Sequence, residues 1–365
     1  MSGKLLVNLS VLIPQPTGIS VYANGILPSL KSLDPTLLIA NPKPEFSCYL
    51  VPDHLTPAHG TTGHFRRLLW TQFQLPAIYQ NLQGNLLFSP LPEAPLYSPC
   101  CSIVMAHDLI PLRFPRKGSR LTAYFKYYIP QVLHQAQHIV CNSLATAEDL
   151  TRFFKVPEAK ITPIPLAYNR EQFQFLDLPT RNYFLYIGRH DAYKNLNRLI
   201  TAFSQLNNSC RNSLKNDSDY QLWLAGPTDQ IYTPQLQAQV KALNLESQVQ
   251  FLNYVSATEL PRILNQAVAL VFPSLWEGFG LPVLEAMACG TPVIASNLSS
   301  LTEVGGEAMV SINPYQVEEI AEAMKFLAGN EPERSRLRQL GLHRARQFSW
   351  EKTGQQTAAV LEKYL

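Results

Sequence analysis

Short apolar runs alternate with amphipathic or polar segments along the whole chain of 365 residues. A run of four to eight apolar residues between turn signals is typical of a strand buried on both faces. The pattern predicts one group of strands at residues 4–12, 36–40, 85–89, 102–106, 138–141 and 160–164. It predicts a second group at residues 183–187, 221–225, 248–252, 268–272 and 293–295.

Segments with helical periodicity separate these strands. They predict helices near residues 20–32, 64–80, 119–137, 143–154, 195–206, 234–243, 257–265 and 349–365. Proline is dense in residues 42–57 and 90–99, and residues 207–219 are polar, so we expect all three segments to be surface loops.

Strand–helix alternation in two groups predicts an α/β fold with two doubly wound, Rossmann-like parallel-sheet domains. A chain of this length also exceeds what one hydrophobic core usually organises. Turn-rich residues 165–181 form the expected linker. A ligand is expected in the cleft that the two domains face, at the carboxyl ends of the strands.

Composition narrows the class of protein. Hydrophobic residues make up 46% and charged residues 16% of the chain, as in globular proteins, and a net charge of +3 gives no reason to expect a nucleic-acid partner. The six cysteines include no Cys-x-x-Cys pair, which favours free thiols. The start of the chain lacks a signal-peptide pattern, and no apolar stretch approaches about 20 residues. We expect a cytoplasmic protein, with peripheral contact at the inner face of the membrane left open.

The segment from Glu277 to Glu285 reads Glu-Gly-Phe-Gly-Leu-Pro-Val-Leu-Glu and joins a predicted strand to a predicted helix. Amides at Phe279, Gly280 and Leu281 would be free donors at the helix start, where phosphate oxygens bind. Glu285, expected in the first helical turn, could accept hydrogen bonds from ribose hydroxyls. Glu277 could reach a sugar or fix the loop. An ordinary helix cap with two surface glutamates is the alternative.

A second segment, residues 188–195, reads Gly-Arg-His-Asp-Ala-Tyr-Lys-Asn and again follows a predicted strand. Arg189 and Lys194 would bring two positive charges to the carboxyl edge of the sheet. Such cations stabilise the charge that grows on a departing diphosphate, so no metal would be needed. Solvated surface charges are the alternative.

Weaker candidates lie in the first half. His107 and Asp108 follow a predicted strand and suit recognition of substrate hydroxyls or proton transfer, although a structural pair is as plausible. Gly18 opens the first predicted helix and could face a phosphate, or form an ordinary turn. Aromatic residues at 124–128 favour packing over a membrane stripe, and residues 64–70 carry too few cations to predict a lipid surface.

These motifs resemble those of glycosyltransferase family 4, also called glycosyl transferase group 1, whose members are retaining enzymes with the GT-B fold. The segment from Glu277 to Glu285 resembles the family's Glu-x7-Glu signature, and Arg189 with Lys194 matches its other donor-site motif. His107-Asp108-Leu109 resembles a motif of mannosyltransferase-like members. Residues 348–351, Phe-Ser-Trp-Glu, resemble the start of the family's terminal helix.

The resemblance implies an N-terminal acceptor-side domain at 1–172, a donor domain at 173–347 and a terminal helix, 348–365, that packs back on the first domain. It also implies residue roles. The expected catalytic residues are Glu277, His107, Arg189 and Lys194, and the acceptor side includes His107 and Asp108. The expected donor-binding residues are Gly18, Arg189, Lys194, Tyr254, Val255, Gly278, Phe279, Gly280, Leu281 and Glu285. In the family, glycine usually occupies the position of Asn253, beside the nucleobase.

The implied reaction moves a hexose with retention from a nucleotide-diphosphate sugar to a hydroxyl of a saccharide or lipid-linked acceptor, without metal or cofactor. GDP-mannose is favoured over UDP-sugars. A dehydrogenase of similar topology is disfavoured, because residues 278–283 lack the third glycine of the dinucleotide fingerprint. A non-catalytic nucleotide-sugar-binding protein, or an inactive partner subunit, remains the alternative.

Overall fold

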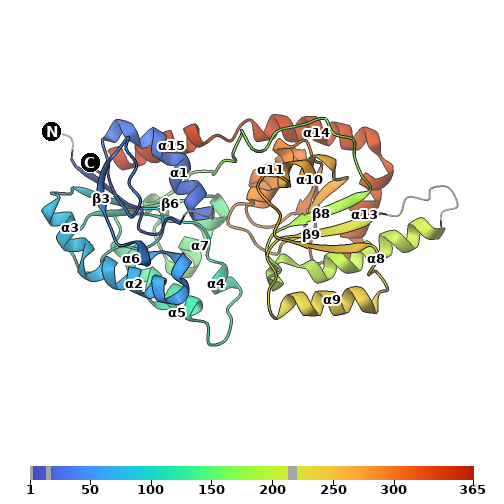
Figure 1. The fold of residues 1–365 in the computed structure, drawn as a ribbon, viewed down its shortest axis with the longest axis horizontal. Coiled ribbons are helices and arrows are strands. Elements are labelled where there is room, and N and C mark those ends of the chain that lie inside the picture. Colours follow the sequence, from blue (N-terminus) through green and yellow to red (C-terminus); the bar gives the residue numbers. More distant parts are fainter. Residues whose placement is uncertain (1–2, 14–17, 213–219) are drawn as a thin grey trace. The chain divides into compact units, whose positions relative to one another are not determined.

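The computed structural model describes residues 3–13, 18–212 and 220–365, and Figure 1 shows the elements along the chain. It divides into two compact units. Unit 1 comprises Met1–Leu166 together with Ser349–Leu365, and unit 2 comprises Ala167–Phe348. The chain therefore passes from one unit to the other twice.

Unit 1 is built on a seven-stranded parallel sheet in the order β3-β2-β1-β4-β5-β6-β7. The central strands are buried along their whole length, which explains their apolar runs. The prediction of a loop over residues 42–57 was wrong in part: β3 lies there as an exposed edge strand. The strands are β1 Leu5–Asn8, β2 Thr36–Ile39, β3 Ser47–Leu50, β4 Leu86–Ser89, β5 Ser102–Ala106, β6 His138–Cys141 and β7 Ile161–Pro163.

Two predicted helices of unit 1 are each broken in two. New helices begin at Leu75 and Ile129, and the next residue is proline in both cases. Proline lacks an N–H and disfavours helical backbone before it, so the preceding helix ends there. The helices are α1 Gly18–Leu30, α2 Gly60–Phe73, α3 Leu75–Asn81, α4 Ile110–Arg113, α5 Arg120–Tyr127, α6 Ile129–Gln135, α7 Leu144–Phe154 and α15 Trp350–Glu362.

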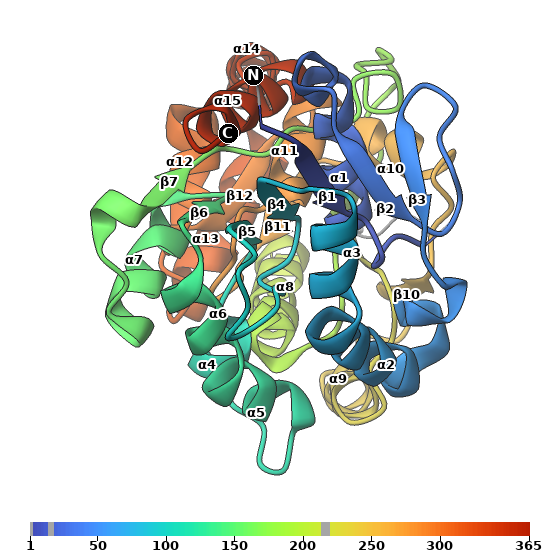
Figure 2. The same cartoon turned by 90° about the vertical axis from the view of Figure 1, so that its left-hand side faces the viewer.

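The terminal helix α15 packs along α1 within unit 1 (Figures 1 and 2). A Cβ atom at Gly25 of α1 would collide with the Trp350 ring, so only glycine allows this approach. Thr353 Oγ1 donates a hydrogen bond of 2.8 Å to the Pro165 carbonyl, which ties α15 to the end of the contiguous part of the unit.

Unit 2 has a six-stranded parallel sheet in the order β10-β9-β8-β11-β12-β13. This is the Rossmann order, in which the topological switch point falls between β8 and β11. The strands are β8 Tyr183–Ile187, β9 Gln221–Ala225, β10 Val249–Asn253, β11 Ala269–Phe272, β12 Val293–Ser296 and β13 Val310–Ile312. The helices are α8 Leu196–Asn212, α9 Tyr232–Ala242, α10 Leu260–Gln266, α11 Leu281–Ala288, α12 Leu301–Gly305, α13 Val317–Gly329 and α14 Glu331–Ala345.

The expected polar loop at residues 207–219 begins too early. Helix α8 continues to Asn212, and residues 213–219 lie outside the described part of the chain. A membrane-spanning helix, which needs length and apolar character together, is absent from the residues that the structure describes.

Candidate functional site

The loops that follow β8 and β11 leave the sheet on the two sides of its switch point, where doubly wound folds bind ligands. Their central feature is a buried ion pair. Lys194 Nζ lies 2.6 Å from Glu277 Oε1, and the two side chains are 11% and 10% exposed. The Lys194 ammonium also lies over the Phe272 ring, 5.2 Å from its centroid. Removing either partner would leave a buried charge without compensation.

Arg189 is placed differently from Lys194, although both belong to the same loop. Its side chain is 64% exposed, and its Nε donates to Asp191 Oδ2 at 3.2 Å. Lys194 is therefore buried and fixed, whereas the exposed side chain of Arg189 is free to reorient toward a ligand.

Asn195 anchors this loop to the sheet. Its Nδ2 donates to the carbonyls of Pro273, at 3.1 Å, and Pro314, at 2.6 Å. It has a φ of +63°, a conformation that asparagine tolerates better than most residues. The role of Asn195 as a bridge to the loop after β11 was not predicted from the sequence.

The start of α11 presents unpaired backbone donors. Within the described residues, no protein acceptor bonds the N–H groups of Phe279, Gly280 or Leu281. Gly280 has a φ of +105°, and a Cβ there would collide with Leu301, so glycine is required. This geometry leaves the three amides unpaired among the described residues, and their binding of an anionic ligand stays a prediction.

Glu285 lies in the second turn of α11, and its expected position in the first turn was wrong. The residue is partly exposed, yet burial of its carboxyl raises the pKa to about 7. No group that the structure describes donates a hydrogen bond to this carboxyl. A carboxyl in this state is suited to a ligand that brings hydroxyl donors.

The end of β10 carries the residues expected beside a nucleobase. Asn253 has a φ of +52°, which explains why glycine is usual at this position in the family. Tyr254 is 77% exposed, so its ring is available to a ligand, and Val255 is half-buried.

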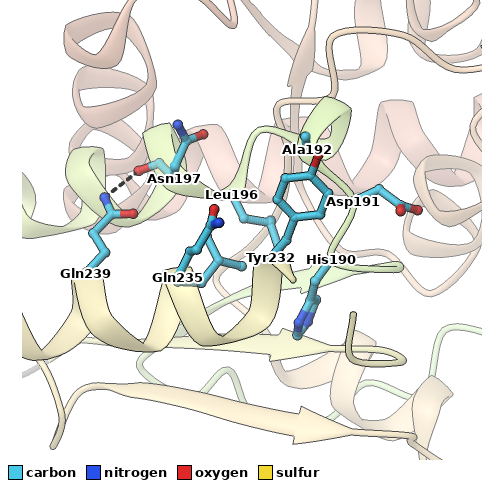
Figure 3. Close-up of a pocket in the computed structure, with 9 residues that line it drawn as sticks. His190, Asp191, Ala192, Leu196, Asn197, Tyr232, Gln235 and Gln239 are labelled. Carbon is cyan, nitrogen blue, oxygen red and sulfur yellow. Dashed lines mark hydrogen bonds between the residues drawn. The ribbon is translucent and has the colours of Figure 1, made fainter. Parts of the chain in front are cut away.

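A cavity of about 260 Å³ lies between the starts of α8 and α9 (Figure 3). Three of its lining residues share the loop of Arg189 and Lys194. His190 Nδ1 lies 2.9 Å from Thr233 Oγ1, while its buried Nε2 has no partner among the described residues. The lining residues are His190, Asp191, Ala192, Leu196, Asn197, Tyr232, Gln235, Leu236 and Gln239.

His107 follows β5 in unit 1. Its Nε2 lies 2.9 Å from the Pro90 carbonyl, which can only accept, so Nε2 carries the proton and Nδ1 offers a lone pair. Burial lowers the pKa of the imidazole to about 4, which keeps it neutral near pH 7. The Asp108 carboxylate accepts the Ile110 N–H at 3.0 Å at the start of α4.

Gly18 is the exposed first residue of α1, and residues 14–17 before it lie outside the described part of the chain. Gly18, His107 and Asp108 belong to unit 1, whereas the other candidate residues belong to unit 2. Within unit 2, the structure brings Lys194 and Glu277 together from two loops.

Residues 90–99 form a loop, as their prolines predicted, but residues 92–95 are buried and not at the surface. Glu93 is 2% exposed and forms a bidentate ion pair with Arg67, at 2.7 and 2.9 Å. Tyr124 donates to the same carboxylate at 2.9 Å and stacks on Tyr128, which confirms the packing role for these two aromatics, whereas Tyr127 is 63% exposed. Trp70 is buried as well, so it and Arg67 cannot form a lipid surface.

Two solved structures identify the fold. Sucrose-phosphate synthase from Thermosynechococcus elongatus is similar over 99% of this chain and 98% of its own, with a TM-score of 0.73 and 20% identity. HepE from Anabaena, solved with UDP-glucose, is similar over 99% of this chain and 100% of its own, with a TM-score of 0.74 and 15% identity. The chain thus has the predicted GT-B fold of glycosyltransferases.

Family comparison makes the identification more specific. The model for "Glycosyl transferases group 1" matches residues 169–344, and the model for "Glycosyltransferase Family 4" matches residues 17–172. The chain belongs to this family of glycosyltransferases, as its motifs predicted.

Curated relatives include O-antigen chain mannosyltransferases. The chain is 31% identical to O-antigen chain mannosyltransferase B of Escherichia coli over 64% of its own length, and spans 62% of that protein. It is 27% identical to O-antigen chain mannosyltransferase RfbU of Salmonella typhimurium over 85% of its length, and spans 87% of that protein.

Proposed function

We propose that this protein transfers a hexose, with retention of configuration, from a nucleotide-diphosphate sugar to a hydroxyl of a saccharide or lipid-linked acceptor. The observation that carries the proposal is the set of groups at one switch point. These are the buried Lys194–Glu277 pair, the unpaired amides at the start of α11 and the unpartnered Glu285 carboxyl. GDP-mannose is the favoured donor, since the relatives are named mannosyltransferases, and UDP-sugars come next.

In the proposed reaction, Lys194 and Arg189 stabilise the negative charge that grows on the diphosphate as the sugar–phosphate bond breaks. The acceptor oxygen bonds to the anomeric carbon on the same face, through a state resembling an oxocarbenium ion. The departing phosphate oxygen takes the acceptor proton. His107 Nδ1 accepts a hydrogen bond from a sugar hydroxyl, and Glu285 binds the ribose. Because the cations come from the protein, we propose that neither metal nor cofactor is required.

The test is a transfer assay with GDP-mannose, UDP-glucose, ADP-glucose and dTDP-glucose, using mannosides and lipid-linked saccharides as acceptors. We expect transfer from one donor, a product with the donor's anomeric configuration by proton NMR, and an unchanged rate in EDTA. Inversion, or a rate abolished by EDTA and restored by a divalent cation, would refute the corresponding part of the proposal.

The alternative is a protein that binds the nucleotide sugar without catalysis. It predicts a donor-dependent rise in melting temperature but neither transfer nor slow donor hydrolysis. Hydrolysis of the bound donor without acceptor would exclude it.

Peripheral membrane contact is part of the proposal, because lipid-linked acceptors reside at membranes. On unit 1, α2 exposes Phe65, Leu69 and Phe73 on one helical face, by 59%, 42% and 76%. Apart from the buried pair Arg67–Glu93, residues 60–135 contain six Lys or Arg and one acidic residue. An exposed apolar face in a basic segment is complementary to an anionic lipid surface.

We expect Phe65→Ser/Phe73→Ser to lower binding to phosphatidylglycerol-containing vesicles at least about a hundredfold, because each phenyl group inserted into lipid contributes roughly 1.5–3 kcal/mol. Co-sedimentation measures this. Leu144→Ser is the control, since Leu144 is a 59% exposed leucine on α7 of the same unit. If both variants bind the vesicles equally well, α2 does not contact the membrane.

A further inference from the structure

We infer that Ser299 and Ser300 are positioning residues for the donor site, an inference that rests on the proposed function. Both lie just before α12, and their side chains form hydrogen bonds with the backbone of the loop that begins at Glu277. Ser300 Oγ lies 3.0 Å from the Glu277 carbonyl and 2.8 Å from the Phe279 carbonyl. Ser299 Oγ accepts the Glu277 N–H at 3.0 Å. The hydroxyl of Ser300 has a single proton for the two carbonyls, and its shorter contact is with Phe279, so the loop is held from one side at Glu277 and Phe279.

The consequence follows from peptide geometry. In a trans peptide, the carbonyl and the following N–H lie in one plane and point in opposite directions. Holding the Phe279 carbonyl toward Ser300 therefore directs the Gly280 N–H away from Ser300. That N–H is among the amides left unpaired at the start of α11. The hydroxyl thus fixes the orientation of a donor that it does not itself touch.

Two features distinguish these serines from an ordinary helix cap. Ser300 is the N-cap residue of α12 and fully buried, yet its side chain caps no N–H of that helix. Ser299 has a φ of +57°, which costs a residue with a side chain about 1–3 kcal/mol. Ser300 forms no capping bond, and Ser299 has a strained backbone. Both features indicate that the contacts with the loop constrain these two residues.

The experiment compares Ser300→Ala and Ser299→Ala with wild type, using GDP and guanosine, or UDP and uridine if wild type binds uridine nucleotides. We expect the diphosphate affinity to fall about tenfold and kcat to fall with it, while nucleoside affinity stays within twofold. Nucleoside binding depends on β10 and Glu285 rather than on the loop amides. Ser299 is partly exposed, so its variant keeps the test usable if Ser300→Ala misfolds.

Ser204→Ala is the matched control. Ser204 is partly buried on α8, and its hydroxyl donates to the Thr201 carbonyl of the same helix at 2.7 Å, so we expect unchanged affinities. Folded serine variants that bind diphosphate like wild type would overturn the inference. Equal weakening of diphosphate and nucleoside would also overturn it, since that marks a general structural role. Wild type that binds no nucleotide would instead refute the proposed function.

Discussion

Lys194→Ala is expected to lower sugar transfer about a thousandfold, because it removes the buried cation that lies beside Glu277 at the switch point. The exposed Arg189 cannot replace it, since its charge remains largely in water. The same change leaves Glu277 as a buried, unpaired carboxylate, which should cost about 3–5 kcal/mol of stability. Kinetics and urea unfolding therefore have to be measured on the same preparation.

A double variant separates the two effects. Lys194→Ala/Glu277→Gln has no unpaired carboxylate at position 277. It should therefore recover much of the free energy of unfolding, while transfer stays low. Lys241→Ala on α9 is the control, since Lys241 is exposed and far along the chain from either loop. A stable double variant with wild-type transfer would show that the cation is dispensable.

Glu285→Gln should have opposite effects on stability and on donor binding. Burial raises the folded-state pKa of Glu285 from 4.5 to about 7. The favourable contribution of the protonated form is fully present below pH 4.5 and is lost as pH rises through 7. At pH 8 the ionised carboxyl then costs the ligand-free protein up to about 3 kcal/mol, a cost that glutamine avoids.

We therefore expect Glu285→Gln to be more stable than wild type at pH 8 but not at pH 4, and to bind the donor at least about tenfold more weakly. Urea unfolding at both pH values and calorimetric titration check this. Glu318→Gln, an exposed position on α13, should change neither quantity. If Glu285→Gln binds the donor as wild type does, the ribose is held elsewhere.

The buried strands were predictable because parallel strands covered on both faces must be apolar. Residues 183–187 and 221–225 match β8 and β9 residue for residue. β3 was missed because its side chains are mostly exposed and proline-rich segments flank it. Burial of Glu93 could not be foreseen either, because its partner Arg67 lies 26 positions away and nothing local marks the pair.

The site was predictable to the extent that its residues cluster in sequence. Glycines and charges after two strands pointed to the loops at the switch point, and the fold places those loops there. Contacts between the loops could not be predicted from the sequence. Lys194 and Glu277 are 83 positions apart, and the position of Ser300 before a helix suggests an ordinary helix cap. Tertiary packing decides whether a polar side chain bonds its own helix or a distant loop.

The two crossings of the chain between its units have a consequence for synthesis on the ribosome. Unit 1 needs residues 349–365, yet unit 2 is made in between. Unit 2 can reach its native state while unit 1 still waits for the helix that covers α1. The face of α1 that α15 covers in the native protein therefore stays uncovered while residues 167–348 are made, which is when chaperones would be expected to bind it.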